Sequence, residues 1–486
     1  MSMIKVENLS FTYPGSYDPI FEQVNFQIDT AWKLGFVGRN GRGKTTFLQL
    51  LLGAYDYSGH IHGSVPFDYF PYPVRQPERP AQAVLEEVCP QAEAWELLRE
   101  LADLEVEWEV LQRPFLTLSQ GEQTKLLLAA LFLNPGHFLL IDEPTNHLDS
   151  RARALVAAYL NKKSGFILVS HDRRFLDGCV DHILSLNRAT IDVQSGNFSS
   201  WLDNFQRQQD FEAAQNQKLQ KDIRRLQQAS KRSGVWSDRV EASKAGAYDK
   251  GYIGHKAAKM MKRSKALEAR QQQALEETSS LLKNVETAEA LKLFPQPYHA
   301  RVLAAFSEVS IQYGARQICP PLSFSVERGE RIALEGRNGS GKSSILKLLL
   351  GEAVPHSGTV TLGSGLVISY VPQGTDHLHG PLSAFIQGAK LDGSLFLAIL
   401  RKMGFARVQF EKNLEDYSAG QKKKVLLAKS LCEQAHLYVW DEPLNYIDIY
   451  SRMQIEDLLR HFAPTMLFVE HDGAFRETIA TKVVSL

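Results

Sequence analysis

Two copies of one glycine-rich pattern carry the most specific chemistry in this sequence. Residues 38–45 read GRNGRGKT and residues 336–343 read GRNGSGKS, so both fit GxxxxGK[ST]. In such a loop the glycines let backbone N–H groups turn toward phosphate oxygens, and a lysine reaches the outer phosphates. We therefore expect two ATP sites, formed by Gly38, Arg39, Asn40, Gly41, Arg42, Gly43, Lys44, Thr45 and Thr46, and by Gly336, Arg337, Asn338, Gly339, Ser340, Gly341, Lys342, Ser343 and Ser344.

Paired carboxylates follow a short apolar run in each half of the chain. Asp142 and Glu143 follow FLLI, and Asp441 and Glu442 follow LYVW. A loop hydroxyl and an aspartate suit Mg²⁺, and a glutamate beside them can polarise the water that attacks the terminal phosphate. We expect Mg²⁺ ligands at Thr45, Asp142, Ser343 and Asp441, and catalytic carboxylates at Glu143 and Glu442.

Histidines occupy matched positions after a further apolar run in each half. His171 follows FILVS and His471 follows MLFVE, 300 residues later. One histidine in such a place is more often a structural residue than a functional one. The matched pair favours a catalytic role as a sensor of the γ-phosphate.

These landmarks recur at nearly one offset, which indicates two homologous domains. The loop lysines Lys44 and Lys342 are 298 residues apart. Apolar runs at 34–37 and 332–335 predict strands that lead into the loops, and the residues after each loop predict a helix. We expect two α/β domains in which buried parallel strands carry the carboxylates at their ends.

The segment between the halves differs from both in composition. It is rich in Gln, Lys, Arg, Ala and Glu, which predicts helices at about 202–231 and about 256–292. Between residues 218 and 270, nine Lys and six Arg stand against five acidic residues, although the whole chain has no net charge. Such a segment suits a polyanion, and equally a solvated helix face. The expected domains are 1–200, 201–297 and 298–486.

Bulk composition excludes several classes of protein. A chain of 486 residues, 44% hydrophobic and 23% charged, is neither collagen-like nor wholly disordered, and its length allows several domains. No apolar run approaches the roughly 18 residues that cross a bilayer. The first residues lack the pattern of a secretion signal. We expect a cytoplasmic protein without a transmembrane domain.

A third motif connects the chain with a known family. Residues 118–122 read LSQGE and residues 417–421 read YSAGQ, which resembles the LSGGQ/E signature of ATP-binding cassette (ABC) ATPases. In that family two nucleotide-binding domains pair head to tail, and each ATP lies between the phosphate loop of one and the signature of the other. The resemblance implies two composite sites within a monomer, Lys44 with Ser418 and Gly420, and Lys342 with Ser119 and Gly121.

Two further positions are similar to the family's pattern. Tyr13 and Tyr313 occupy the place of its adenine-stacking aromatic residue. Gln373, in VPQ, matches the Q-loop glutamine that contacts Mg²⁺, whereas the first half has Tyr72 in FPY. The first site is therefore expected to turn over differently from the second.

The sequence most resembles ABC subfamily F (ABC-F). EPTNHLD at 143–149 is typical of that subfamily, and EPLNYID at 442–448 is similar to the variant in its antibiotic-resistance members. The resemblance covers essentially the whole chain. It implies an ATPase, without a membrane permease, whose helical hairpin enters the tRNA exit site of the 70S ribosome, near 23S rRNA and P-site tRNA. There it would dislodge or exclude lincosamides, streptogramin A and pleuromutilins, and ATP hydrolysis would release the protein.

The basic segment supplies the expected ribosome contacts. Positive charges suit rRNA phosphates, and aromatic side chains can stack on bases. The predicted phosphate contacts are Lys256, Lys259, Lys262 and Arg263. The predicted tip, about 232–255, carries Val235, Trp236, Tyr248, Tyr252 and Ile253 in a glycine-punctuated loop.

Three other interpretations remain open at this point. The linker alone can be a coiled-coil spacer with a solvated basic face. The whole chain can be the ATPase of a separate membrane transporter, which would need a coupling surface and no basic hairpin. It can also be a housekeeping ABC-F translation factor that acts on stalled ribosomes without any drug, because such a protein has the same ATP motifs.

Overall fold

The computed structural model describes residues 2–14, 19–146, 148–187, 191–212, 214–215, 218–219, 221, 290–314 and 316–486. Contacts group Met1–Trp201 with Ala288–Leu486 in one compact unit and place Leu202–Thr287 in another. The predicted tip residues and the predicted rRNA contacts lie outside the described residues, as does His147 in the first EPTNHLD motif.

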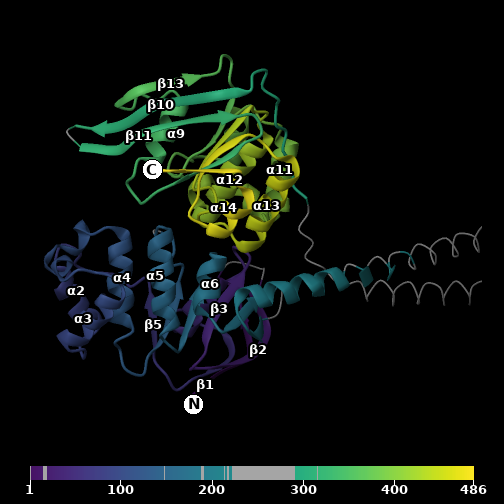
Figure 1. The fold of residues 1–486 in the computed structure, drawn as a ribbon. Coiled ribbons are helices and arrows are strands. Elements are labelled where there is room, and N and C mark those ends of the chain that lie inside the picture. The colour runs from purple at the N-terminus through teal and green to yellow at the C-terminus, as the bar shows by residue number, and fades with distance from the viewer. Residues whose placement is uncertain are drawn as a thin grey trace, which may run out of the picture. The chain divides into compact units, whose positions relative to one another are not determined.

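The N-terminal half contains two sheets with flanking helices (Figure 1). A six-stranded sheet has the order β5-β6-β7-β3-β8-β9, parallel except for the β8–β9 pair, and an antiparallel sheet has the order β2-β1-β4. The elements are β1 (Met3–Phe11), β2 (Phe21–Asp29), β3 (Lys33–Gly38), α1 (Lys44–Leu51), β4 (Ser58–His62), β5 (Phe67–Phe70), α2 (Ala81–Val88), α3 (Ala94–Asp103), α4 (Gln120–Leu131), β6 (Phe138–Asp142), α5 (Ser150–Asn161), β7 (Phe166–Val169), α6 (Arg173–Cys179), β8 (His182–Leu186) and β9 (Ile191–Ser195).

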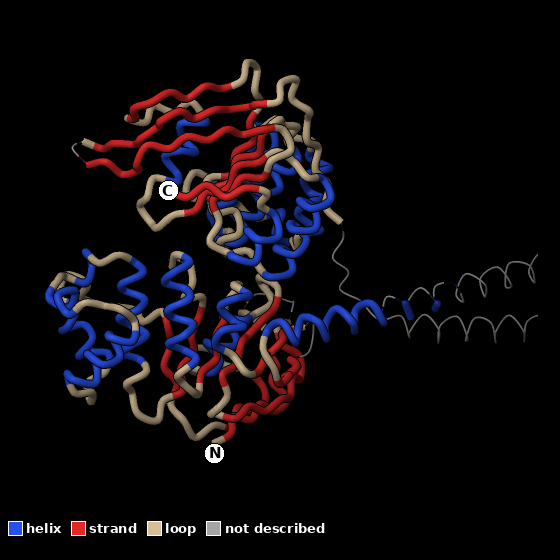
Figure 2. Tube along the Cα trace, in the orientation of Figure 1, coloured by secondary structure: helices blue, strands red, loops and turns tan. Residues whose placement is uncertain are grey.

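The C-terminal half repeats this plan. Its parallel sheet has the order β14-β15-β16-β12-β17, and its antiparallel sheet has the order β11-β10-β13. The elements are β10 (Val302–Tyr313), β11 (Arg316–Glu327), β12 (Arg331–Glu335), α9 (Lys342–Leu349), β13 (His356–Leu362), β14 (Ile368–Val371), α10 (Leu382–Gly388), α11 (Gly393–Lys402), α12 (Ala419–Cys432), β15 (Leu437–Asp441), α13 (Ile449–Phe462), β16 (Met466–Val469), α14 (Gly473–Ile479) and β17 (Lys482–Ser485). Figure 2 shows strands gathered together in each half, with helices around them.

The predicted strands are confirmed. The apolar runs before the carboxylates form β6 and β15, whose apolar residues are buried, and the runs before the histidines form β7 and β16. A strand covered on both faces must be apolar throughout, which is why these segments read as continuous runs without alternation. The expected class, two α/β domains, is therefore correct.

Each signature segment folds as the start of a helix. The Ser119 hydroxyl accepts a hydrogen bond from the Glu122 backbone N–H at 3.3 Å, and the Glu122 carboxylate accepts one from the Ser119 backbone N–H at 2.8 Å. Ser418 and Gln421 make the same reciprocal pair at the start of α12. The S-x-x-E/Q spacing is a capping box, so the local sequence alone begins α4 and α12 at these serines.

Only the first part of the first predicted linker helix and the last residues of the second lie among the described residues. A helix runs over 198–212, so the described part of the first predicted helix is helical. The second predicted helix reaches 292, but residues 290–292 are not helical. The reason is packing, since Leu291 and Leu293 alternate into the core of the C-terminal half while the residues between and after them are exposed. Among the described residues, no helix combines the length and apolarity that crossing a membrane requires.

Replacing Leu293 with Ala tests this anchoring. The side chain is 2% exposed, so we expect a loss of about 2–4 kcal/mol in the free energy of unfolding of the C-terminal half. Phe294→Ala is the control, because Phe294 is 38% exposed. Urea titration followed by circular dichroism measures both, and equal losses would contradict the packing.

Candidate ATP sites

The phosphate loops join a buried strand to a helix in both halves. Gly43 and Gly341 cap α1 and α9 with φ angles of 103° and 94°, a region that favours glycine. A Cβ on Gly43 would lie 2.4 Å from Ile20 Cγ2, so this loop also lacks room for a side chain. Lys44 Nζ and Lys342 Nζ each donate to the carbonyl of the first loop glycine at 2.8 Å. Backbone N–H groups at a helix start and a lysine within the loop form a cradle for phosphates.

The predicted Mg²⁺ ligands meet beside each loop. Thr45 Oγ1 donates to Asp142 Oδ2 at 2.7 Å. In the second half, burial raises the pKa of Asp441 to about 6, and the Ser343 side chain acts in the opposite direction. Asp441 Oδ1 is buried and has no hydrogen-bond partner in the described part of the chain. Hydroxyl and carboxylate oxygens are ligands that Mg²⁺ prefers, so these residues fit the ion. When bound, Mg²⁺ would neutralise charge on the outer phosphates.

Both predicted catalytic glutamates have an unusual backbone conformation. Their φ angles are 51° for Glu143 and 46° for Glu442, in the left-handed region that residues other than glycine rarely adopt. Their backbone N–H groups donate to the carbonyls of Val169 and Val469, both at 2.9 Å, so the neighbouring strand holds each glutamate in place. Strained conformations of this kind cluster at functional sites.

The surroundings of Glu442 favour its ionised form. Burial alone would raise its pKa, but hydrogen bonds with the side chains of His471, Gln373 and Asn445 outweigh burial and lower the pKa to about 2. His471 Nε2 lies 3.5 Å from Glu442 Oε1. The sequence-predicted glutamate, histidine and Q-loop glutamine of the second half therefore form one connected group.

Glu143 has the opposite electrostatic environment. Burial and the nearby Asp142 raise its pKa to about 8. His171 Nε2 lies 3.3 Å from Glu143 Oε1, but burial and Lys44 hold the pKa of His171 well below its ordinary value. His171 is therefore neutral and gives Glu143 no full positive charge.

Asn40 fixes the tautomer of His171. Its Nδ2 donates to the carbonyl oxygen of Tyr446 at 2.6 Å, so its Oδ1 is the atom that lies 3.0 Å from His171 Nε2. Because an amide oxygen only accepts, the proton of the neutral imidazole lies on Nε2. Asn40 thus links the first phosphate loop and the first histidine to the C-terminal half.

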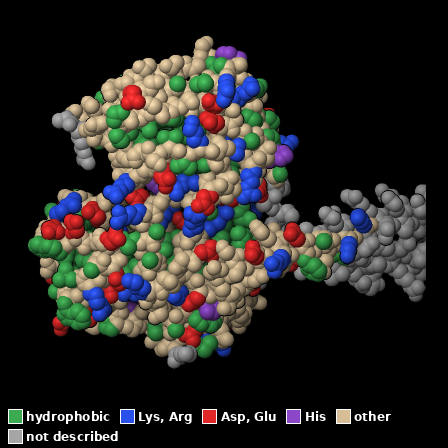
Figure 3. Space-filling model, viewed as in Figure 1, with side chains coloured by type: hydrophobic (Ala, Val, Ile, Leu, Met, Phe, Trp, Pro, Cys, Tyr) green, Lys and Arg blue, Asp and Glu red, His purple; other side chains and the backbone are tan. Residues whose placement is uncertain are grey.

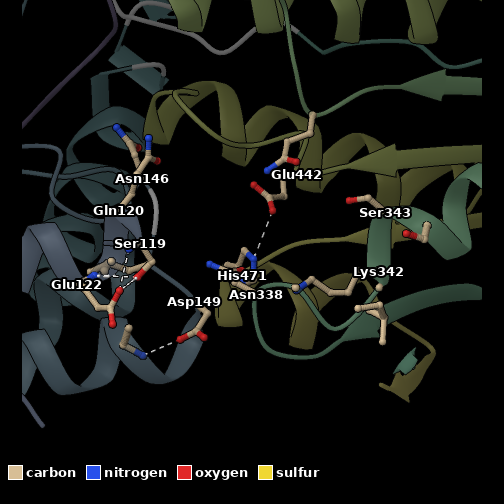
Figure 4. Close-up of a pocket in the computed structure, with 18 of the residues that line it drawn as sticks. Ser119, Gln120, Glu122, Asn146, Asp149, Asn338, Lys342, Ser343, Glu442 and His471 are labelled. Atoms are coloured by element: carbon tan, nitrogen blue, oxygen red, sulfur yellow. Dashed lines mark hydrogen bonds and ion pairs between the residues drawn. The ribbon is translucent and has the colours of Figure 1, made fainter. Parts of the chain in front are cut away.

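The signature of each half faces the phosphate loop of the other. One cavity, of about 420 Å³, is lined by Lys44, Thr45, Glu143, His171, Ser418 and Gly420. A second, of about 720 Å³, is lined by Lys342, Ser343, Glu442, His471, Ser119 and Gly121. We name them the first and second composite sites. In Figure 4, Ser119 and Gln120 lie on one side of the second site, and Lys342 and Ser343 on the other.

Gly420 allows a close approach at the first composite site. A Cβ at this position would lie 2.5 Å from the Tyr446 carbonyl oxygen and 2.7 Å from Asn40 Nδ2. The neighbouring Ala419, where the family pattern has glycine, is exposed and also lines this site. The departure from the pattern therefore leaves the close contact intact.

The two predicted adenine-stacking tyrosines lie at the rims of the sites. The Tyr13 hydroxyl is 2.7 Å from Thr46 Oγ1, and the Tyr313 hydroxyl is 3.1 Å from Ser344 Oγ. Tyr313 is 48% exposed, which leaves ring surface for a base. Residues 39–43 of the first phosphate loop lie between β3 and α1, and residues 336–341 of the second lie between β12 and α9. The Arg39 guanidinium lies over the ring of Tyr450, 5.5 Å from the ring centre.

Sequence reasoning missed a tyrosine at the first site. Tyr72 is half-buried and does not line the first composite site, whereas the Tyr69 hydroxyl donates to Asp142 Oδ2 at 3.2 Å. Tyr370 holds the matched place in the second half, and burial and Asp441 raise its pKa to about 12. The signal was present, since Tyr69 and Tyr370 each stand two residues before a proline, Pro71 and Pro372.

A buried ion pair behind each histidine was also missed. Arg153 Nη1 lies 2.9 Å from Asp172 Oδ2, and Arg452 Nη1 lies 2.9 Å from Asp472 Oδ2. Each arginine also donates through Nε to the carbonyl of the residue before the aspartate that ends the EPxNxxD motif. These pairs fix the loops that flank the sites, and their repetition 299 to 300 residues apart was readable from the sequence.

Comparison with known proteins agrees with this geometry. The family model described as "ABC transporter" matches residues 21–146 and 319–445. The chain belongs to the ABC family. As a member it is an ATPase, the activity expected from the sequence.

Relatives extend the similarity along the whole chain. The ribosome protection protein VmlR of Bacillus subtilis is 27% identical over 96% of this chain and 84% of its own length. The energy-dependent translational throttle protein EttA of Escherichia coli K12 is 26% identical over 96% of this chain and 89% of its own. Both similarities extend over almost the whole chain, in line with the resemblance to ABC-F seen in the sequence.

A solved structure has the same fold. The complex of archaeal ribosomal stalk protein aP1 and ribosome recycling factor aABCE1 contains a chain that matches with a TM-score of 0.64 and 18% identity. The match covers 98% of this chain and 87% of that one, so the fold is common to both.

The unequal glutamates predict unequal pH dependence. In Glu442→Gln only the first site keeps its glutamate, and we expect its kcat/KM, which reports ionisations of the free enzyme, to rise with pH through about 8, because a base works when deprotonated. In Glu143→Gln the remaining Glu442, with a pKa of about 2, is ionised throughout, so kcat/KM should stay flat from about pH 6 to 9. Steady-state ATPase assays at saturating Mg²⁺ measure both, and identical profiles would contradict the assignment.

Proposed function

We propose that this protein is a ribosome-associated ATPase in which ATP binding closes the two halves and hydrolysis releases the ribosome. The supporting observation is the presence of a phosphate loop, paired carboxylates, a histidine and an opposing signature in each of two composite sites. ATP with Mg²⁺ is the nucleotide that these residues suit. Similarity to VmlR and EttA along 96% of the chain supports the ribosome as the partner.

The proposed ribosome contact lies in the linker. Charged side chains of both signs are mixed over the face seen in Figure 3. The surplus of basic residues falls instead between residues 218 and 270, outside most of the described chain. We assign rRNA phosphate contacts to Lys256, Lys259, Lys262 and Arg263, and a contact beside the peptidyl-transferase centre, from the tRNA exit site, to the tip at 232–255.

The finer proposal is protection against lincosamides, streptogramin A and pleuromutilins. It rests on the EPLNYID variant and on the similarity to a ribosome protection protein. Drug-independent action on stalled ribosomes is a second candidate, because the throttle protein EttA is nearly as similar. Both place a monomer with domains 1–200, 201–297 and 298–486 in the cytoplasm, without a membrane permease.

Replacing Glu143 and Glu442 together with Gln tests the hydrolysis-gated cycle. Gln keeps the shape but cannot act as a base, so ATP should bind while turnover falls by about a hundredfold or more. The variant should then co-sediment with ribosomes in ATP and stay bound. Lys44→Ala with Lys342→Ala is the control that should not become trapped, and rapid release of the glutamine variant with ATP bound would refute the cycle.

A susceptibility panel separates resistance from a housekeeping role. Expression in a sensitive host should raise the inhibitory concentrations of the three drug classes and leave a drug of another binding site unchanged. A variant with the tip shortened should lose protection but keep its ATPase activity, because both composite sites remain. Full protection by that variant would rule out the tip, and no protection by the parent would favour the translation factor.

A further inference from the structure

Lys423 is a buried lysine that the sites described above do not use. Its side chain is 1% exposed, and Nζ donates to the carbonyls of Pro372 at 2.8 Å, Gln373 at 3.1 Å and Asp441 at 3.2 Å. An ammonium group has three N–H donors, so all three are used. The lysine therefore has no capacity left for a ligand and acts on the backbone that it contacts.

Those three carbonyls belong to two backbone segments that carry residues of the second composite site. Pro372 and Gln373 form the Q-loop, and Asp441 ends β15. Gln373, Ser343 and Glu442 line that site, and Glu442 directly follows Asp441 in the chain. Moving the ammonium would thus move the backbone that aims the glutamine and both carboxylates.

The helix that carries Lys423 also serves the first composite site. Ser418 and Gly420, at the start of α12, line that site. Five residues of helix at ~1.5 Å each separate Ser418 from Lys423, a span of ~7.5 Å that a helix transmits with little deformation. Lys424 fastens the same turn, because its Nζ donates to Asp448 Oδ2 at 2.6 Å and to the Met403 carbonyl at 2.7 Å.

The N-terminal half has no lysine in the matched position. Thr124 stands 299 residues before Lys423, and Lys125 before Lys424. Lys125 Nζ donates to the Leu104 carbonyl at 3.0 Å, as Lys424 does to Met403. A threonine hydroxyl has one donor and a short reach, so Thr124 cannot hold three carbonyls. A lysine that donates to three carbonyls at this position is therefore a feature of the C-terminal half and not of the N-terminal half.

We propose that Lys423 is a positioning residue that couples the two ATP sites in one direction. When Ser418 and Gly420 engage ATP at the first site, α12 is held in place, and Lys423 then holds the Q-loop and the end of β15 in the arrangement that hydrolyses ATP at the second site. The proposal rests on the two composite sites assigned above.

The first test isolates turnover at the second site in a Glu143→Gln parent. We expect Lys423→Thr, which copies Thr124, to lower kcat about tenfold while KM changes less than about twofold, because substrate contacts remain. Lys423→Arg should restore at least half of kcat, since a guanidinium also donates to carbonyls. The matched control is Lys422→Thr, at a half-buried neighbour, which should behave as the parent.

The second test measures the coupling itself. In the same parent, Ser418→Ala should slow the second site about threefold, and in the presence of Lys423→Thr it should cause no further loss. In the mirror-image parent, Glu442→Gln, Lys423→Thr should leave the effect of Ser119→Ala on the first site unchanged. Independent, multiplying losses in the first parent would overturn the coupling.

A further variant separates positioning from folding. Lys423→Met keeps the length of the side chain but has no donors, so it should show the same loss of kcat as Lys423→Thr. All variants are compared by thermal unfolding, and a loss of kcat that follows stability alone, or normal kcat in a folded Lys423→Met, would refute the proposal. If neither single-glutamine parent hydrolyses ATP at a separable rate, the assigned carboxylates fail together with the coupling.

Discussion

Parallel pairing of neighbouring strands is the constraint on which both sites depend. β3, β6 and β7 pair side by side, as do β12, β15 and β16. Parallel strands end at the same edge of a sheet, so whatever follows each strand meets there. The phosphate loop, the two carboxylates and the histidine come from three separate strand ends, and only this pairing brings them together.

The two halves share this arrangement of strands, but the equivalent glutamate has a different electrostatic environment in each. Glu442 is surrounded by donors, so its ionised form is stabilised even though it is buried. Glu143 is buried beside Asp142 with a neutral histidine, so its ionised form is disfavoured. A repeat of motifs is therefore no guarantee of a repeat of function, because ionisation depends on the few groups around each oxygen.

Much of the fold was predictable, because its signals are local. Apolar runs gave the central strands, and the spacing within each signature began its helix. The predicted end of the second linker helix was wrong, because Leu291 and Leu293 pack into the core and this tertiary packing overrides helix propensity. Other hydrogen bonds join residues that are distant in sequence, namely the bond from Asn40 to Tyr446 and those from Lys423 to three carbonyls. No local pattern predicts them.

The left-handed backbone at Glu143 and Glu442 sets a limit on how this protein can evolve. Asparagine or glycine at these positions would relieve a conformational cost of about 1–3 kcal/mol each, so random substitution toward a more stable chain leads away from glutamate. Glutamate in both places thus lowers the stability of the folded state, because each holds a backbone conformation that it does not favour. A thermostable descendant is accordingly expected to accumulate its stabilising changes in loops and on surfaces remote from these two peptide units.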